Sequence, residues 1–157
     1  MNIDVFIETI SRAELDSSRQ ALLDAAFAAL DHAYAPYSGF RVAAAVRLAG
    51  GETLTGTNQE NASYPIGICA ERVALSTANS VVANAEIHAM AVVYRPAAGP
   101  GSVPPAPCGM CRQALVEQHA RQGRPFELIM AAEQGEVWQV SDASSLLPLA
   151  FTPSDLG

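Results

Sequence analysis

Positive charge is scarce in this chain. Nine Lys and Arg residues stand against sixteen Asp and Glu, which gives a formal net charge of −7. A protein that binds the phosphates of DNA or RNA usually carries a basic stripe, so this composition argues against a nucleic-acid partner. A small, freely diffusing substrate fits the charge better.

Long apolar runs and a signal-peptide pattern are also missing. The first residues include Asp4 and Glu8, whereas a signal peptide begins with basic residues followed by an apolar run. The apolar runs at 89–94 and 128–132 are strand-length and too short to cross a bilayer. The three cysteines cannot all pair with one another, and nothing indicates secretion. We therefore expect a protein of the reducing cytoplasm with no membrane partner.

Apolar residues are plentiful. They make up 50% of the 157 residues, while charged residues make up 16%, which is typical of a compact globular protein. A chain of this length can bury enough surface to be stable without cross-links. We expect one domain over residues 1–157.

Turn residues and apolar periodicity predict an α/β fold. Glycines or prolines separate segments whose apolar residues alternate as in strands from segments with helical spacing. Ser11 and Glu14 have the spacing of a capping box, which predicts a helix start there, and Pro36 ends that helix. The strands are expected at 41–49, 53–57, 87–94, 126–132 and 137–140, and the later helices at 69–82, at 107–123 and after Asp142. The result is a three-layer α/β/α sandwich with a mixed five-stranded sheet.

The three cysteines mark the candidate site. Cys69, Cys108 and Cys111 all lie at predicted helix starts, where backbone N–H groups and the helix dipole stabilise a thiolate. The C-x-x-C spacing of the last two lets both sulfurs reach one ion, and soft sulfur ligands favour zinc or an iron–sulfur centre. The alternative, three cysteines buried in the core, does not explain why every one begins a helix.

A fourth ligand is harder to find. His32, His88 and His119 are the only histidines, and none has the spacing of a zinc finger. Three protein ligands with one open position is the catalytic arrangement, in which zinc lowers the pKa of a bound water to about 7. Glu71 lies two residues after Cys69, where it could move protons. Spacing alone thus predicts a cytosolic zinc-activated hydrolase.

These motifs resemble those of a known family. Cys69-Ala70-Glu71 followed by Pro107-Cys108-Gly109-Met110-Cys111 is similar to the zinc-dependent nucleoside and nucleobase deaminases. The segments 34–42, 58–65, 69–74, 107–113 and 146–151 resemble, in order, five motifs of the small three-cysteine cytidine deaminases. The resemblance runs from about residue 20 to 157 and leaves residues 1–15 as an N-terminal extension.

The resemblance implies a reaction and roles for the central residues. Free cytidine or deoxycytidine would be hydrolysed to uridine or deoxyuridine and ammonia by zinc-bound hydroxide, a step of pyrimidine salvage. One zinc ion per subunit would be held by Cys69, Cys108 and Cys111, and Glu71 would carry protons to the base and to the leaving amine.

The resemblance also implies how substrate is bound. Asn58 and Glu60 would hydrogen-bond the ribose, Phe40 would pack near the base, and Ala70 would offer backbone groups to it. Arg72 would offset the excess negative charge of three thiolates. The protein would be a homotetramer with active sites shared between subunits, and Phe151 would reach a neighbour's pocket.

Two other functions stay open at this point. One is a sister zinc deaminase that acts on another amino-heterocycle. The other is a non-catalytic module stabilised by zinc, which would need a fourth ligand and would leave Glu71 without a role. Nothing in the sequence distinguishes cytidine from deoxycytidine, and the Pro- and Gly-rich loop at 96–107 has no assigned role.

Overall fold

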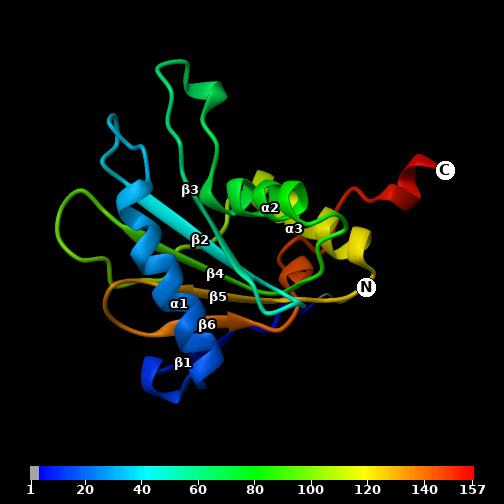
Figure 1. Ribbon diagram of the computed structural model, residues 1–157, viewed down its shortest axis with the longest axis horizontal. Coiled ribbons are helices and arrows are strands. Elements are labelled where there is room, and N and C mark those ends of the chain that lie inside the picture. Colours follow the sequence, from blue (N-terminus) through cyan, green and yellow to red (C-terminus); the bar gives the residue numbers. More distant parts are fainter. Residues whose placement is uncertain (1–3) are drawn as a thin grey trace.

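The computed structural model describes residues 4–157 and forms one sheet covered by helices on both faces (Figure 1). The first three residues of the predicted N-terminal extension lie outside the described part. The sheet has six strands in the order β1-β6-β5-β4-β2-β3. Their bounds are β1 Glu8–Ile10, β2 Arg41–Leu48, β3 Thr53–Thr57, β4 Ile87–Arg95, β5 Glu127–Ala131 and β6 Val137–Val140.

The predicted mixed sandwich is confirmed, but the strand count of five is wrong. The sixth strand, β1, lies in the predicted extension and pairs antiparallel with β6 at one edge of the sheet. It has three residues, of which Glu8 and Thr9 are exposed. So short a segment, with one half-buried apolar residue, carries no alternating pattern that could mark it as a strand.

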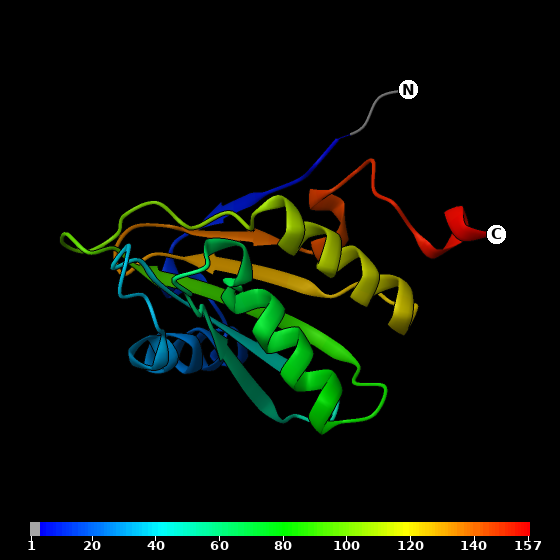
Figure 2. The same cartoon turned by 90° about the horizontal axis from the view of Figure 1, so that it is seen from above.

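Three helices form the outer layers. α1 (Ser17–Ala29) covers one face of the sheet, while α2 (Ala70–Val81) and α3 (Gly109–Gln122) cover the other (Figure 2). α1 begins at Ser17 with Asp16 as its N-cap, and the predicted capping box of Ser11 and Glu14 opens a separate 3-10 turn. Short 3-10 turns complete the chain, at Arg12–Glu14, Leu30–His32, Tyr64–Ile66, Ala143–Leu146 and Pro153–Leu156.

Two cores lie on the two faces of the sheet. Alternate residues of β2 point to opposite sides, so that Ala44 and Val46 face α2 and α3 while Ala43 and Ala45 face α1. Alanines on the α1 side let that helix lie close to the strands. Within residues 4–157, no helix has both the length and the apolar character needed to cross a membrane.

The topology places the N-termini of two helices at the same end of the sheet, beside the carboxyl ends of its parallel strands. β2 is antiparallel to both β3 and β4, so β3 runs parallel to β4, and β4 pairs parallel with β5. α2 and α3 are therefore the crossover connections of two consecutive parallel units on the same face. Both helices begin just beyond the carboxyl ends of strands, which is where α/β proteins place their sites.

One close contact fixes the height of α2 above the sheet. A side chain at Gly56 in β3 would collide with the backbone of Val73 and Ala74 in α2. Only glycine allows this approach, because it has no Cβ. The first turn of α2 is thereby held directly against the edge strand.

Candidate metal centre and substrate cleft

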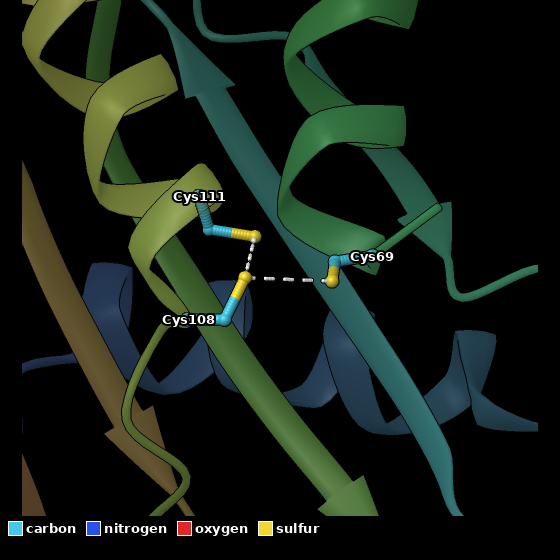
Figure 3. A group of neighbouring side chains, drawn as sticks. All are labelled: Cys69, Cys108 and Cys111. Atoms are coloured by element: carbon cyan, nitrogen blue, oxygen red, sulfur yellow. Dashed lines mark hydrogen bonds between the residues drawn. The ribbon is translucent and has the colours of Figure 1, made fainter. Parts of the chain in front are cut away.

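The helix starts bring the three cysteines together. Cys69 is the N-cap of α2 and Cys108 the N-cap of α3, and both have extended backbones. Cys111 lies in the first turn of α3, and Figure 3 shows its side chain turned toward the other two. The sequence prediction that every cysteine begins a helix is thus confirmed to within one turn.

The sulfur atoms are spaced as ligands of one ion. The Sγ atoms of Cys69 and Cys108 are 3.8 Å apart, and those of Cys108 and Cys111 are 3.5 Å apart. All three lie within 4.8 Å of one another, and they form the group of candidate metal-ligating side chains found among residues 4–157. Three soft thiolates suit zinc and do not suit magnesium or calcium.

Contacts among the three sulfurs shift the pKa values of two of the thiols in opposite directions. The hydrogen bond from Cys111 lowers the pKa of Cys69 to about 6, helped by Cys108 and by the charge of Arg72. The same contact with Cys69, together with burial, raises the pKa of Cys111. The ionisation of one thiol thus disfavours the ionisation of its neighbour. A dication removes this conflict, since it stabilises all three thiolates at once.

Glu71 is buried beside the cluster. It has 5% of its surface exposed, and it lies in the first turn of α2, two residues after Cys69. Burial raises the pKa of this carboxyl, against hydrogen bonds from its own backbone N–H and from the Cys111 thiol. A carboxyl whose pKa is raised binds a proton more readily than an exposed one does, which suits a general acid–base group.

The histidines lie away from the sulfurs in the described structure. Nδ1 of His119 is 3.1 Å from a carboxylate oxygen of Asp142, and Nε2 of His88 is 3.3 Å from that of Glu86. His32 is exposed, at the end of a 3-10 turn. Within residues 4–157, no histidine or carboxylate joins the three cysteines as a fourth protein ligand.

A cleft of about 480 Å³ opens next to Cys69. It brings together two of the predicted substrate-binding residues, Asn58 and Glu60, with one of the cysteines. The remaining lining residues come from two loops, one between the Leu30–His32 turn and β2 and the other between β3 and α2. They were not assigned roles from the sequence. They are Tyr37, Ser38, Gln59, Asn61, Tyr64, Gly67 and Ile68.

Asn58 and Glu60 hold the loops of the cleft in place. Oδ1 of Asn58 accepts the backbone N–H of Val42 at 2.8 Å, and its Nδ2 donates to the carbonyl of Phe40 at 2.8 Å. Oε2 of Glu60 accepts the N–H of Tyr37 at 2.9 Å, while Oε1 accepts the hydroxyl of Ser38. The Ser38 hydroxyl and then the Tyr37 N–H lower the pKa of Glu60, which is therefore ionised.

Phe40 and Ala70 are the other two residues that were expected to contact the base. The ring of Phe40 stacks on Tyr94, with centroids 5.0 Å apart, and 39% of the residue is exposed. Ala70 is fully buried as the first residue of α2. Its N–H is one of the helix-start donors that have no partner within the helix. Neither residue is among those that line the cleft.

Arg72 and Phe151 lie apart from the cleft. Arg72 faces the groove between α2 and α3, and no hydrogen bond joins it to a cysteine within residues 4–157. Phe151 is 60% exposed in the C-terminal segment. Its carbonyl accepts a hydrogen bond of 2.7 Å from Nε2 of Gln113.

The sequence reasoning missed Tyr37, Ser38 and Tyr64. The rings of Tyr37 and Tyr64 meet edge to face, with centroids 5.9 Å apart, and both residues are more than half exposed. The signal was present, because Tyr37 and Ser38 belong to the motif at 34–42 and Tyr64 to that at 58–65. Neither motif shows by itself that the two loops face each other.

Known proteins match both the sequence and the fold. The family model of the cytidine and deoxycytidylate deaminase zinc-binding region matches residues 16–123 of this chain. The cytidine deaminase of Halalkalibacterium halodurans is 38% identical over 138 residues, which cover 88% of this chain and 97% of that protein.

Solved structures agree with this match. The crystal structure of cytidine deaminase from Burkholderia pseudomallei has a TM-score of 0.74 and 41% identity, over 84% of this chain and 98% of that one. That of cytidine deaminase from Mycobacterium tuberculosis has a TM-score of 0.65 and 33% identity, over 87% and 98% of the two chains. Sequence, fold and cysteine cluster agree: this chain belongs to the cytidine and deoxycytidylate deaminase family.

Proposed function

We propose that this protein is a zinc-dependent hydrolase that converts free cytidine and deoxycytidine to uridine and deoxyuridine with release of ammonia, a reaction of pyrimidine salvage. Membership of the family supports the activity. The observation that carries the proposal is the convergence of three cysteine sulfurs, within 4.8 Å, beside the buried carboxyl of Glu71. A non-catalytic module would need a fourth ligand and would not explain Glu71.

The three thiolates of Cys69, Cys108 and Cys111 would hold one zinc ion per subunit. When bound by three protein ligands, zinc lowers the pKa of a coordinated water toward 7 and so supplies a nucleophile at neutral pH. The N-termini of α2 and α3 add positive potential at the sulfurs. The site thus gains stabilisation of its negative charge from the backbone as well as from the metal.

Glu71 would move the protons. In the reaction, water adds to C4 of the cytosine ring and the exocyclic amine leaves as ammonia. Glu71 takes a proton from the attacking water, delivers it to N3 of the base, and then helps to protonate the departing amine. Its burial suits both steps, because the raised pKa lets the carboxyl accept a proton and give it back.

The cleft residues would orient the nucleoside. Asn58 and Glu60 would hydrogen-bond the ribose hydroxyl groups; each still has unused hydrogen-bonding capacity beyond the backbone contacts described. Phe40 would pack near the base, and the backbone of Ala70 would meet its polar edge. The net charge of −7 disfavours a phosphorylated substrate, which supports a free nucleoside.

Arg72 would balance the charge of the metal site. Zinc with three thiolates carries a net charge of −1, and the charge of Arg72 already acts on Cys69. We expect Arg72→Ala to keep the fold but to lower zinc affinity or turnover. Zinc content and kcat equal to those of the wild type would contradict this role.

The protein would work as a cytoplasmic homotetramer. Large apolar side chains remain exposed near the cleft and on the C-terminal segment, among them Tyr64, Ile66 and Phe151. Burial of these residues between subunits would let Phe151 reach a neighbour's pocket. A reducing compartment would keep the three free cysteines available as metal ligands.

The first experiment follows the ultraviolet absorbance of cytidine and deoxycytidine with the zinc-loaded protein. We expect the absorbance near the cytidine band to fall with the wild type and to stay constant with Glu71→Ala. Glu71→Gln is the matched variant, because it keeps the size of the side chain and removes its acid–base function. No absorbance change despite bound zinc would refute the proposed substrate.

A further inference from the structure

Two aromatic rings stack at the end of the sheet where the cysteines lie. The ring centroids of Phe40 and Tyr94 are 5.0 Å apart, and the ring planes are inclined to each other by 27°. Tyr94 lies near the carboxyl end of β4, after which the chain leads to Cys108 and α3. Phe40 directly precedes β2. The stack therefore joins the loop before β2, which lines part of the cleft, to a central strand of the sheet.

The strand register puts both rings on the face of the sheet that α2 and α3 cover. Tyr94 is paired with Val42 in β2, and Phe40 is two residues before Val42. Residues two apart in a strand point to the same face, and diagonal neighbours on that face are within reach of aromatic side chains. Val42 packs against the core beneath α2 and α3, as does Val92, two residues before Tyr94. The stack therefore lies on the same side of the sheet as the three cysteines.

Residues of the cleft hold the backbone of Phe40. Nδ2 of Asn58 donates to its carbonyl at 2.8 Å, and its own N–H donates to the hydroxyl oxygen of Ser38 at 3.0 Å. Asn58 and Ser38 both line the cleft. These hydrogen bonds fix the main chain of Phe40 but not the rotation of its ring about the side-chain bonds. The stacking contact with Tyr94 limits that rotation.

The Pro- and Gly-rich loop at 96–107 holds Tyr94 in turn. Gly101 in this loop is buried, and a Cβ at this position would collide with the ring and the hydroxyl group of Tyr94. The main chain of the loop therefore passes directly against the tip of the ring, which only glycine allows. The loop is fastened to the turn between β5 and β6, because the carbonyl of Gly101 accepts the N–H of Gln134 at 3.1 Å.

The same loop also lies against the segment that carries Phe40. A Cβ at Gly39 would come within 2.8 Å of the Cβ of Ala97, and Figure 2 shows the two loops side by side at one end of the sheet. Gly39 has a φ of 67°, a conformation that favours glycine. The loop, Tyr94 and Phe40 thus form one packed unit.

We propose that Tyr94 is a positioning residue that holds the ring of Phe40 in place to pack against the cytosine base, and that the loop at 96–107 supports it through Gly101. This inference rests on the proposed function, in which Phe40 packs near the base. Tyr94 covers one face of the Phe40 ring, and 39% of Phe40 stays exposed to meet a substrate. A ring that is already held in one orientation loses less entropy when the substrate binds.

The test is a double-mutant cycle read in KM for cytidine and deoxycytidine. Tyr94→Leu fills much of the space but removes the flat ring, and Phe40→Leu makes the same change at the base. We expect Tyr94→Leu to raise KM by about two- to tenfold, the range of an aromatic pair, with kcat and zinc content close to wild type. The factor should be equal for both nucleosides, because Phe40 meets the base and not the sugar. In the Phe40→Leu background, Tyr94→Leu should raise KM no further.

Three further variants make the result specific. Tyr94→Phe keeps the ring and should retain the wild-type KM. Gly101→Ala introduces a Cβ whose nearest neighbours are all atoms of Tyr94, so it should raise KM by displacing that ring. Ser102→Ala changes the exposed neighbour in the same loop and should leave KM unchanged. An unchanged KM in Tyr94→Leu, or effects that add in the double variant, would overturn the proposal.

A second measurement does not depend on activity. Urea denaturation of the wild type, the two single variants and the double variant shows whether Phe40 and Tyr94 stabilise the fold as a pair. We expect the double variant to lose less stability than the sum of the two single losses. Additive losses would overturn the contact itself, even if cytidine is turned over. Coupled losses in a protein that acts on neither nucleoside would confirm the stack and place the failure in the proposed function.

Discussion

The metal centre and the substrate cleft are built in different ways. Cys111 and Glu71 lie buried at the starts of two helices that pack on the sheet, so the core holds them. The cleft is formed by exposed loops, whose shape depends on side-chain hydrogen bonds from Asn58 and Glu60. The reactive groups are thus positioned by the fold itself, whereas the recognition groups depend on a few polar contacts.

The largest effect should follow a change in the metal centre. We expect Cys111→Ser to abolish deamination and to reduce bound zinc from one ion per chain to almost none, because two ligands hold the metal poorly. The measurement is metal analysis together with cytidine turnover. Wild-type protein stripped with a chelator should regain activity when zinc is added, and the variant should not. A fully active Cys111→Ser would show that the core does not position the metal.

Asn58 lines the cleft and also holds the start of β2, so a change there tests both recognition and stability. Asn58→Ala removes two hydrogen bonds to the start of β2 and should lower the free energy of unfolding by about 1–3 kcal/mol, as well as raise KM. Urea denaturation and steady-state kinetics measure the two effects. Asn58→Asp keeps the acceptor for the N–H of Val42 and should be less destabilised. A rise in KM without loss of stability would assign Asn58 to substrate alone.

Glu60 should affect recognition and leave chemistry intact. Glu60→Gln weakens the contacts to Tyr37 and Ser38 and removes a charged acceptor for the ribose, so KM should rise about tenfold, the effect of about 1.4 kcal/mol. The kcat should change little, because the metal centre is held elsewhere. Glu52→Gln, on the exposed turn between β2 and β3, is the matched control. An equal fall in kcat would break the distinction between the two regions.

The smallest effect should come from the sixth strand. A variant that begins at Ser11 lacks β1 and exposes the edge of β6. This strand is far from β3, which lies at the opposite edge of the sheet, and from α2. We expect the melting temperature to fall by about 2–4 °C, as for a loss of about 1 kcal/mol, with kcat and KM unchanged. Loss of activity would mean that the extension supports the site.

The sequence predicted the reactive half of the site better than the recognition half. Cys69, Cys108 and Cys111 could be found because helix-start positions and C-x-x-C spacing are local patterns. Asn58 and Glu60 were found only through the resemblance, since alone they read as an ordinary turn. The facing of Tyr37 and Tyr64 is a long-range packing result that no local pattern contains.

The fold shows the same division. The strands β2 and β3 and the crossover helices follow from periodicity and turn residues. Gly123 ends α3 in the left-handed conformation that is typical of a glycine C-cap. β1 could not be foreseen from its own composition. What makes Glu8–Ile10 a strand is its pairing with β6, in which Ile10 lies opposite Val137 and Glu8 opposite Gln139. Likewise, Ser11 and Glu14 form their capping box around a 3-10 turn that the next helix does not continue.

Each of the two crossover connections brings cysteine sulfur to the same end of the sheet. This arrangement also links the folding of the chain to metal binding. Cys69 and Cys108 are 39 residues apart in sequence, and β4 must be in place between them before their helices can meet. Closing so long a loop is entropically costly, so a nascent chain has no complete binding site to offer the metal. The complete three-sulfur site therefore exists only when both crossovers are folded, and a metal ion bound there would oppose their separation.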